Sequence, residues 1–218
     1  PSSVQPPHAP WMVMVGASML WVGWFGFNAG SALSAGADAG MAMLVTHVSA
    51  ATATLVWIVI ERLRFGKSSL VGAVTGTIAG LATITPASGF VGPIGGLTCG
   101  LAGGIVCYFA VELIRNRMRI DDSLDVMAVH GVGGAIGTLL TAFLISAGLG
   151  GVGLDEGVST GSQFHVQLTA VGVTAIYTAV VSVIIIMIVK MTTGLRVSAD
   201  QEREGLDFAS HGETGYNL

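Results

Sequence analysis

The sequence predicts an all-α polytopic membrane helix bundle with six transmembrane helices, and its composition and hydropathy are the first observations behind this prediction. Of its 218 residues, 52% are hydrophobic and only 10% are charged, and the mean hydropathy is +0.75. Soluble domains carry about 25% charged residues, so this chain could not cover its surface with hydrated groups. The composition excludes a cytosolic globular enzyme and a disordered chain. The net charge of −4 also leaves no basic surface for nucleic acid.

Apolar segments of membrane-spanning length are the second observation. A spanning helix needs about 20 mostly apolar residues. The expected spans are 11–33, 40–61, 70–86, 90–114, 123–146 and 164–191. The third segment is short and ends at Pro86.

Residues 1–10 lack the basic start of a secretory signal and resemble a loop between helices. We therefore expect the chain to be the later part of a longer protein. Within the chain, we expect residues 1–193 to form a membrane domain and residues 194–218 a cytoplasmic tail.

The basic residues predict the orientation of the spans. All nine lysines and arginines fall on one side, namely Arg62, Arg64, Lys67, Arg115, Arg117, Arg119, Lys190, Arg196 and Arg203. The opposite connections carry Asp38, Asp155 and Glu156 and no basic residue. By the positive-inside rule the basic side is cytoplasmic. We expect a multi-pass protein of the plasma or inner membrane, with both termini of this chain in the cytoplasm.

Glycines recur at every fourth position in four of the segments. They are Gly26 and Gly30, then Gly72, Gly76 and Gly80, then Gly96, Gly100 and Gly104, and finally Gly133 and Gly137. In lipid, helices associate through close packing, and small residues at this spacing let their backbones approach. The rows predict a tightly packed bundle and indicate no particular function.

Two other patterns carry no chemistry. Cys99 and Cys107 are eight residues apart on one predicted helix, hence about 12 Å apart, which is too far for a disulfide. The run from Gly148 to Gly153 matches the dinucleotide pattern G-x-G-x-x-G, but it follows a membrane helix and not a strand. We expect a flexible loop there and no nucleotide.

His130 is the most informative polar residue. It lies about 12 Å from the cytoplasmic edge of a hydrocarbon core roughly 30 Å thick. An ionisable group at that depth is costly, so it faces a cavity or a partner. One interpretation is a neutral histidine hydrogen-bonded between helices, and the other is a pore group. Gly133, Gly134 and Gly137 are expected on its face, leaving room for another helix or for a narrow lumen.

His47 is the other histidine at membrane depth. It stands beside Thr46 and Ser49, and we expect a plain hydrogen-bonded role for it. The sequence contains no pair of histidines four residues apart, and we expect no metal site.

The first segment carries an aromatic face. Trp24, Phe27 and Ser31 are spaced by three and then four residues, so they share one side of a helix. With His130 lower down, they give the vertical order hydroxyl, ring, ring, imidazole. Such a stripe is also typical of a lipid-interface belt or a packing core. A pathway is favoured by chemistry, because an aromatic face attracts a small cation and a hydroxyl accepts a hydrogen bond from one.

Three runs of sequence resemble one known family. They are GWFGFNAGS at 23–31, DDSLDVMAVHGVGG at 121–134, and a tail with GLR at 194–196, QEREGLD at 201–207 and HGE at 211–213. They resemble the ammonium transporter family (Amt/Mep, with Rh relatives). The resemblance covers essentially the whole chain and matches the sixth to eleventh helices of an eleven-helix subunit.

The resemblance implies roles for four residues. Ser31 would help to recruit ammonium at the outer vestibule, and Phe27 would be one of two gate rings. Trp24 would line the pore, and His130 would be one of two central histidines. The resemblance also implies a homotrimer with one pore per subunit and no cofactor. The other gate ring, the second histidine and an acidic residue belong to family helices that this chain does not match.

The function expected from these observations is transport of ammonium or ammonia through a hydrophobic pore, after cation recruitment and deprotonation. Two alternatives remain open. One is an ammonium sensor whose tail binds a PII-type regulator, and the other is a channel for another small neutral solute. We do not expect an enzyme, because the sequence shows no nucleophile–base pair in a water-accessible site.

Overall fold

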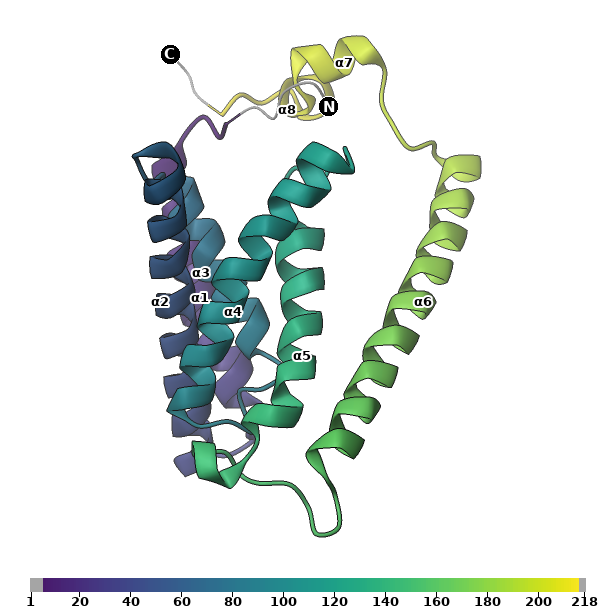
Figure 1. Ribbon diagram of the computed structural model, residues 1–218. Helices are drawn as coiled ribbons and strands as arrows, with labels where there is room; N and C mark the ends of the chain where they lie inside the picture. Colours follow the sequence, from purple (N-terminus) through teal and green to yellow (C-terminus); the bar gives the residue numbers. More distant parts are fainter. Residues whose placement is uncertain (1–5, 216–218) are drawn as a thin grey trace. The chain divides into compact units, whose positions relative to one another are not determined.

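The computed structural model describes residues 6–215, which belong to two compact units, Pro1–Val171 and Gly172–Leu218. Every regular element among the described residues is a helix (Figure 1). The first unit contains the helices α1 Pro10–Gly30, α2 Ala37–Phe65, α3 Leu70–Ile84, α4 Pro93–Glu112 and α5 Val132–Leu144. Two π-helical turns, η1 Leu113–Arg117 and η2 Met127–Gly131, and one 3-10 turn, η3 Ala147–Leu149, also lie in this unit. Helix α6 Thr160–Thr192 begins in the first unit and continues in the second, which also holds α7 Ala199–Glu204 and α8 Leu206–His211.

The helices confirm a multi-pass membrane protein. Five helical segments are long and apolar enough to cross a membrane, namely Pro10–Gly30, Ala37–Phe65, Pro93–Arg117, Met127–Leu144 and Thr160–Thr192. The third predicted span corresponds to α3, which has only 15 residues. Helix α2 runs four residues further than expected, to Phe65, because Gly66 adopts φ 73° and its amide closes the helix on the carbonyl of Arg62.

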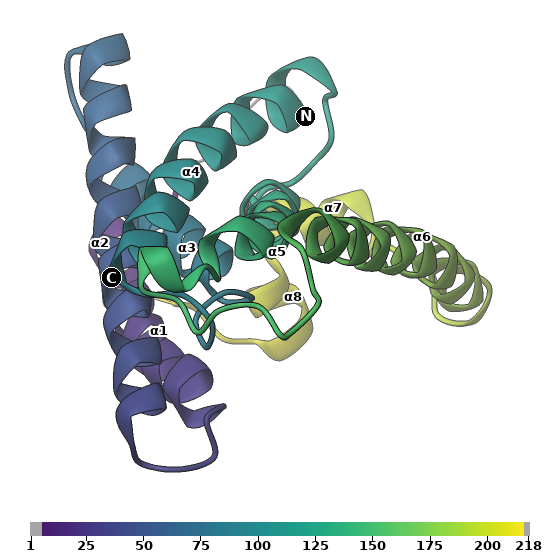
Figure 2. The same ribbon diagram turned by 60° about the horizontal axis from the view of Figure 1, so that its bottom comes forward.

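Helix α3 is the centre of the first unit. It contacts α1, α2, α4 and α5 (Figure 2), and ten of its 15 residues are buried. A helix that is apolar and small all round can accept neighbours on every side. The residues that support the candidate site therefore come from helices that are fixed against one common element.

The glycine rows of α3 and α4 pack against α2, as predicted. A Cβ atom on Gly80 would lie 2.5 Å from the Ser49 carbonyl oxygen, and one on Gly100 would lie 2.6 Å from the same atom. Ser49 in turn donates a hydrogen bond of 2.8 Å to the Gly80 carbonyl. Only glycine permits this three-helix approach. Gly26 and Gly30 of α1 differ, because an added Cβ there would meet nothing within 4 Å among the described residues.

Cys99 and Cys107 are free and buried in α4, as expected. The glycine-rich stretch 148–153 differs from the flexible loop that was expected. Its last two residues are held by backbone hydrogen bonds, since the Gly153 amide donates to the Ile145 carbonyl over 2.8 Å and the Val152 amide donates to the Phe90 carbonyl over 3.0 Å. The second bond attaches the loop after α5 to the connection between α3 and α4.

Ion pairs mark the ends of helices that carry basic residues. In the first unit, Arg64 at the end of α2 makes two hydrogen bonds to the carboxylate of Glu112 on α4, of 2.6 Å and 3.1 Å. In the second unit, Arg196 makes a similar forked pair with Glu202, at 2.7 Å for both bonds. The hydrogen bond from Arg196 holds the pKa of Glu202 below its usual range. Both pairs are exposed, so each stabilises the fold only slightly.

Candidate functional site

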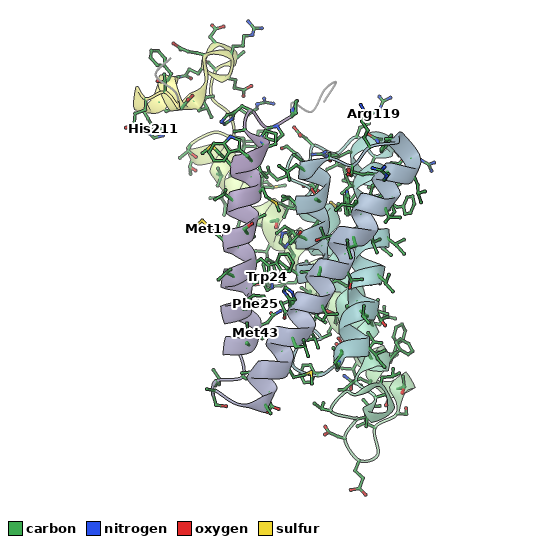
Figure 3. All side chains as sticks on the ribbon, turned by 90° about the vertical axis from the view of Figure 1, so that its left-hand side faces the viewer. Met19, Trp24, Phe25, Met43, Arg119 and His211 are labelled. Atoms are coloured by element: carbon green, nitrogen blue, oxygen red, sulfur yellow. The ribbon has the colours of Figure 1, made fainter. Side chains whose placement is uncertain are left out.

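Helix α1 carries aromatic residues on two sides in its second half. Trp24 and Phe25 are adjacent in sequence, and Met19, which lies above them in Figure 3, points away from the other helices. Trp24 and Phe27 share one side, at a spacing of three, and Trp21 and Phe25 share the other, at a spacing of four. Each side meets one histidine from another helix.

On the first side, Trp24 lies between Phe27 and His130. The Trp24 and His130 rings are stacked, with centroids 6.0 Å apart and an interplanar angle of 20°. The Trp24 and Phe27 rings meet edge to face, with centroids 6.3 Å apart. We call His130, Trp24, Phe27 and Thr85 the His130 cluster. Its contacts follow the expected order of ring, ring and imidazole.

Thr85 fixes the Trp24 ring, although nothing in the sequence marked Thr85 as part of a site. The indole N–H of Trp24 donates a hydrogen bond of 2.7 Å to the Thr85 hydroxyl at the end of α3. That hydroxyl donates in turn to the Leu81 carbonyl over 2.6 Å. An amphipathic ring whose polar edge is bonded has one orientation, so the face of Trp24 that meets His130 is preset. The two residues are 61 positions apart, and no sequence spacing indicates their contact.

Ser31 lies one helical turn after Phe27, at the C-terminal end of α1. It is exposed and caps the end of α1, and its hydroxyl donates a hydrogen bond of 2.7 Å to the Phe27 carbonyl. The hydroxyl oxygen therefore keeps its lone pairs for a donor from outside. Asn28 holds this end of α1 against α2, because its buried side-chain amide donates to the Thr46 hydroxyl over 2.9 Å.

The turn that carries His130 is π-helical, and this corrects one prediction. Gly133 and Gly137 do not share an open face with His130. A Cβ on Gly133 would lie 3.0 Å from the Thr83 hydroxyl, and one on Gly137 would overlap the Thr83 carbonyl of α3. A Cβ on Gly134 would meet nothing within 4 Å, and His130 itself is exposed. Gly133 and Gly137 therefore make room for another helix, which was one of the two alternatives expected, and Gly134 has open space in front of it.

The loop before this turn is held by carboxylates. Asp122 accepts hydrogen bonds from the amides of Val126 and Ala128, of 2.8 Å and 3.2 Å. Asp125 pairs with Arg115, whose Nε lies 2.8 Å from Oδ1 of the carboxylate. Burial raises the pKa of Asp125 to about 6, although Arg115 acts in the opposite direction. Asp125 precedes the membrane-spanning segment that begins at Met127.

On the second side of α1, His47 meets Trp21 and Phe25. Its ring centroid lies 5.2 Å from that of Trp21, at an interplanar angle of 35°, and 6.0 Å from that of Phe25, at 45°. We call these three residues the His47 cluster. A hydrogen-bonded role was expected for His47, but its contacts among the described residues are with rings, and the neighbouring hydroxyls of Thr46 and Ser49 donate to the carbonyls of Ala42 and Gly80.

The side chains of the two clusters are suited to binding a small polar solute. Aromatic faces attract cations, hydroxyl oxygens accept hydrogen bonds, and an imidazole can donate or accept. Among residues 6–215, no group of three or more His, Cys, Asp or Glu is placed to hold a metal ion.

Comparison with known proteins gives a consistent result. The family model described as Ammonium Transporter Family matches residues 2–216. An ammonium transporter of Aquifex aeolicus is 43% identical over 218 residues, which are 100% of this chain and 51% of that protein. The ammonium transporter Amt1 of Archaeoglobus fulgidus is 44% identical over 212 residues, covering 96% of this chain and 53% of that protein. The chain thus spans about half the length of these relatives.

Solved structures show the same fold. A protein described as "Sensor Amt Protein" superposes with a TM-score of 0.86 and 32% identity, over 93% of this chain and 49% of that chain. The crystal structure of Saccharomyces cerevisiae Mep2 superposes with a TM-score of 0.78 and 35% identity, over 89% of this chain and 46% of that chain.

Proposed function

The chain belongs to the ammonium transporter family, and from this premise we propose that it forms the part of a membrane pore that recruits ammonium and conducts ammonia. The observation that carries the proposal is the stacking of His130 on Trp24, with ring centroids 6.0 Å apart. The aromatic faces of these two rings attract a small cation, and the imidazole can donate a hydrogen bond to ammonia or accept one from it. Both properties suit the lining of a narrow pore for a small nitrogen base.

The physical problem is the charge of ammonium. A cation at the centre of a bilayer costs several kcal/mol or more, and the family's substrate can avoid this cost by releasing a proton. Ammonium binds near Ser31, whose hydroxyl oxygen can accept an N–H, and near the exposed ring of Phe27. After deprotonation, ammonia passes Trp24 and His130 through an apolar lumen. Potassium carries no proton to release, so the same route excludes it.

The topology and assembly belong to the same proposal. The basic ends of α2 and α4 face the cytoplasm, in a plasma or inner membrane, and both termini of this chain lie on that side. The protein forms a homotrimer, and residues 194–218 form its cytoplasmic tail. The role is transport and not catalysis, and it needs no cofactor.

The test is uptake in cells that lack their own ammonium transporters. With the protein expressed from its natural gene, we expect uptake of labelled methylammonium that excess ammonium suppresses and excess potassium does not. His130→Ala is expected to change the rate or this discrimination, and His165→Ala, on the exposed face of α6, is the matched control. Uptake at the level of untransformed cells, or equal suppression by potassium, would contradict the proposal.

A second candidate function is sensing, with a PII-type regulator as partner of the tail. The observation in its favour is the superposition with the protein described as "Sensor Amt Protein". The exposed tail offers alternating charges, including the Arg196–Glu202 pair, to a cytoplasmic protein. Capture of a regulator by the intact protein, and loss of capture on deletion of residues 194–218, is the expected result. Equal capture by both forms would exclude the tail as the docking segment.

A further inference from the structure

The end of α4 is bound to the loop that leads into the His130 turn, and one arginine makes the connection. Arg115 lies in the π-turn η1 that extends α4. Its Nε lies 2.8 Å from Oδ1 of Asp125, and the same nitrogen donates to the Asp122 carbonyl over 3.2 Å. Its terminal nitrogen donates to the Ser123 carbonyl over 2.8 Å. The planar guanidinium thus contacts three residues of one loop through donors whose relative positions are fixed, which the freely rotating donors of an ammonium are not.

These contacts hold a backbone conformation that does not form easily by itself. Asp125 adopts φ 57°, a left-handed conformation that L-residues rarely take. The Asp122 carbonyl accepts a hydrogen bond from Arg115, and the Asp122 carboxylate accepts hydrogen bonds from the amides of Val126 and Ala128. The side chain of Asp125 is only 13% exposed and that of Arg115 only 25%, so their pair is shielded from water more than a surface pair is.

The conformation of the loop decides where His130 points. A π-turn contains one residue more than an α-turn. Residues before and after it therefore no longer share a face at separations of three and four. In a continuous α-helix His130 would share a face with Gly133 and Gly137, which pack on α3. With the π-turn, Val129 is buried in the core with Cys107 and Ala79, while His130 is exposed and stacks on Trp24.

We propose that Arg115 is the positioning residue for His130: its guanidinium fixes the 122–125 loop, the loop fixes the π-turn, and the turn aims the imidazole at Trp24. Arg115 touches neither ring and is remote from Ser31 and Phe27. Its importance for transport rests on the proposed function, but its effect on the position of His130 does not.

The test is a double-mutant cycle read by fluorine NMR, with the protein expressed from its natural gene, labelled with 5-fluorotryptophan and held in lipid nanodiscs. The Trp24 and Trp21 resonances are assigned with Trp24→Phe and Trp21→Phe. Because a stacked imidazole shifts the resonance of the ring beneath it, His130→Gln moves the Trp24 signal in the parent protein. In an Arg115→Gln background, we expect that movement to fall below about half of its parent size.

The His47 cluster provides an internal control. The movement of the Trp21 signal on His47→Gln is expected to keep its parent size in Arg115→Gln, because Arg115 contacts none of these residues. Arg117→Gln, in the same turn but exposed, should leave both movements unchanged. Arg115→Lys, which keeps the charge but not the fork, should restore the Trp24 movement only in part.

Two results would overturn the proposal. One is a Trp24 movement of equal size in the parent and in Arg115→Gln. The other is an equal loss at Trp21 and Trp24, since that would show general loosening and no specific positioning. Neither result depends on transport. If the parent protein fails to take up methylammonium but the Trp24 movement is lost in Arg115→Gln, the proposed function fails and the positioning role stands.

Discussion

The His130 cluster and the His47 cluster lie on two sides of the same helix and contain the same kinds of ring, yet they are held differently. In the His130 cluster the indole N–H of Trp24 has an acceptor, Thr85, and the two rings are 20° from parallel. In the His47 cluster the indole nitrogen of Trp21 is buried with no acceptor among the described residues, and its ring is 35° from that of His47. The difference shows that an imidazole beside an indole does not by itself define a site.

The support behind each histidine also differs. His130 sits on a π-turn that is held by Asp122, Asp125 and Arg115 from a neighbouring helix end. His47 sits within the continuous α-helix α2. Side chains that must keep a fixed geometry are placed on supports that are themselves bonded. On this comparison, the transport role that we propose belongs to His130, and we expect His47 to contribute to packing only.

The largest effect is expected from filling the space beside His130. Gly134→Leu adds a side chain one α-turn above His130, where the glycine has no neighbour within 4 Å. We expect methylammonium uptake to fall to background while the amount of folded protein is unchanged. Gly137→Ala should instead reduce the folded protein, because its Cβ would overlap the Thr83 carbonyl. Parent-level uptake by Gly134→Leu would show that this space is not the route.

The next largest effect is expected from the indoles themselves. Trp24→Leu removes the ring on which His130 stacks, and we expect uptake to fall about tenfold, which corresponds to roughly 1.4 kcal/mol in the barrier. Trp21→Leu removes the matching ring of the His47 cluster and should change uptake by less than about twofold. Initial rates measured at equal protein levels give the comparison. Equal losses in both variants would remove the distinction between the clusters.

The hydrogen bond of Trp24 predicts a smaller effect. Thr85→Val keeps the shape of the side chain but leaves the half-buried indole N–H of Trp24 without its acceptor, at a cost of about 1 kcal/mol. We expect a lower melting temperature and a partial loss of uptake. Thr85→Ser keeps the hydroxyl and should restore both. If Thr85→Val behaves as the parent does, Trp24 is as loosely held as Trp21.

The last prediction concerns the dependence of stability on pH, and it applies only to the His130 side. Burial raises the pKa of Asp125 from its ordinary 3.8 to about 6, so the folded protein binds this proton more tightly than the unfolded chain does. The resulting stabilisation is present below about pH 4 and is lost as the pH rises through about 6. The pKa change corresponds to roughly 3 kcal/mol at most, and solvent screening of this half-buried carboxyl reduces it. Asp125→Asn should flatten this part of the stability profile.

Detergent-induced unfolding, followed by circular dichroism between about pH 4 and about pH 7, measures that profile. Asp121→Asn, at an exposed position in the same loop, is the control. A slope that Asp125→Asn leaves unchanged would show that another group titrates in this range.

Much of the fold could be predicted from the sequence, because it depends on local properties. A hydrophobic segment of about 20 residues has few alternatives to a spanning helix. Glycines at a spacing of four, as in Gly72, Gly76 and Gly80, mark a close approach wherever a partner helix is present. Gly26 and Gly30 have the same spacing but no neighbour among the described residues, since a spacing does not show which helix is the partner.

The candidate site was predicted in part for the same reason. Trp24 and Phe27 share a face through helical spacing alone, and the depth of His130 follows from its distance to the helix end. The contact between Trp24 and Thr85 was missed, because it joins residues on different helices. The face of Gly133 and Gly137 was misjudged, because it depends on a π-turn whose support comes partly from Arg115 on α4.

The most direct test of the account compares two single substitutions in purified protein reconstituted into lipid vesicles. With a pH-sensitive dye inside the vesicles, the rate of alkalinisation after an ammonium pulse reports ammonia entry. We expect His130→Gln to change this rate severalfold relative to the parent and His47→Gln to leave it unchanged. Equal rates for the parent and His130→Gln, or an equal change in both variants, would contradict it.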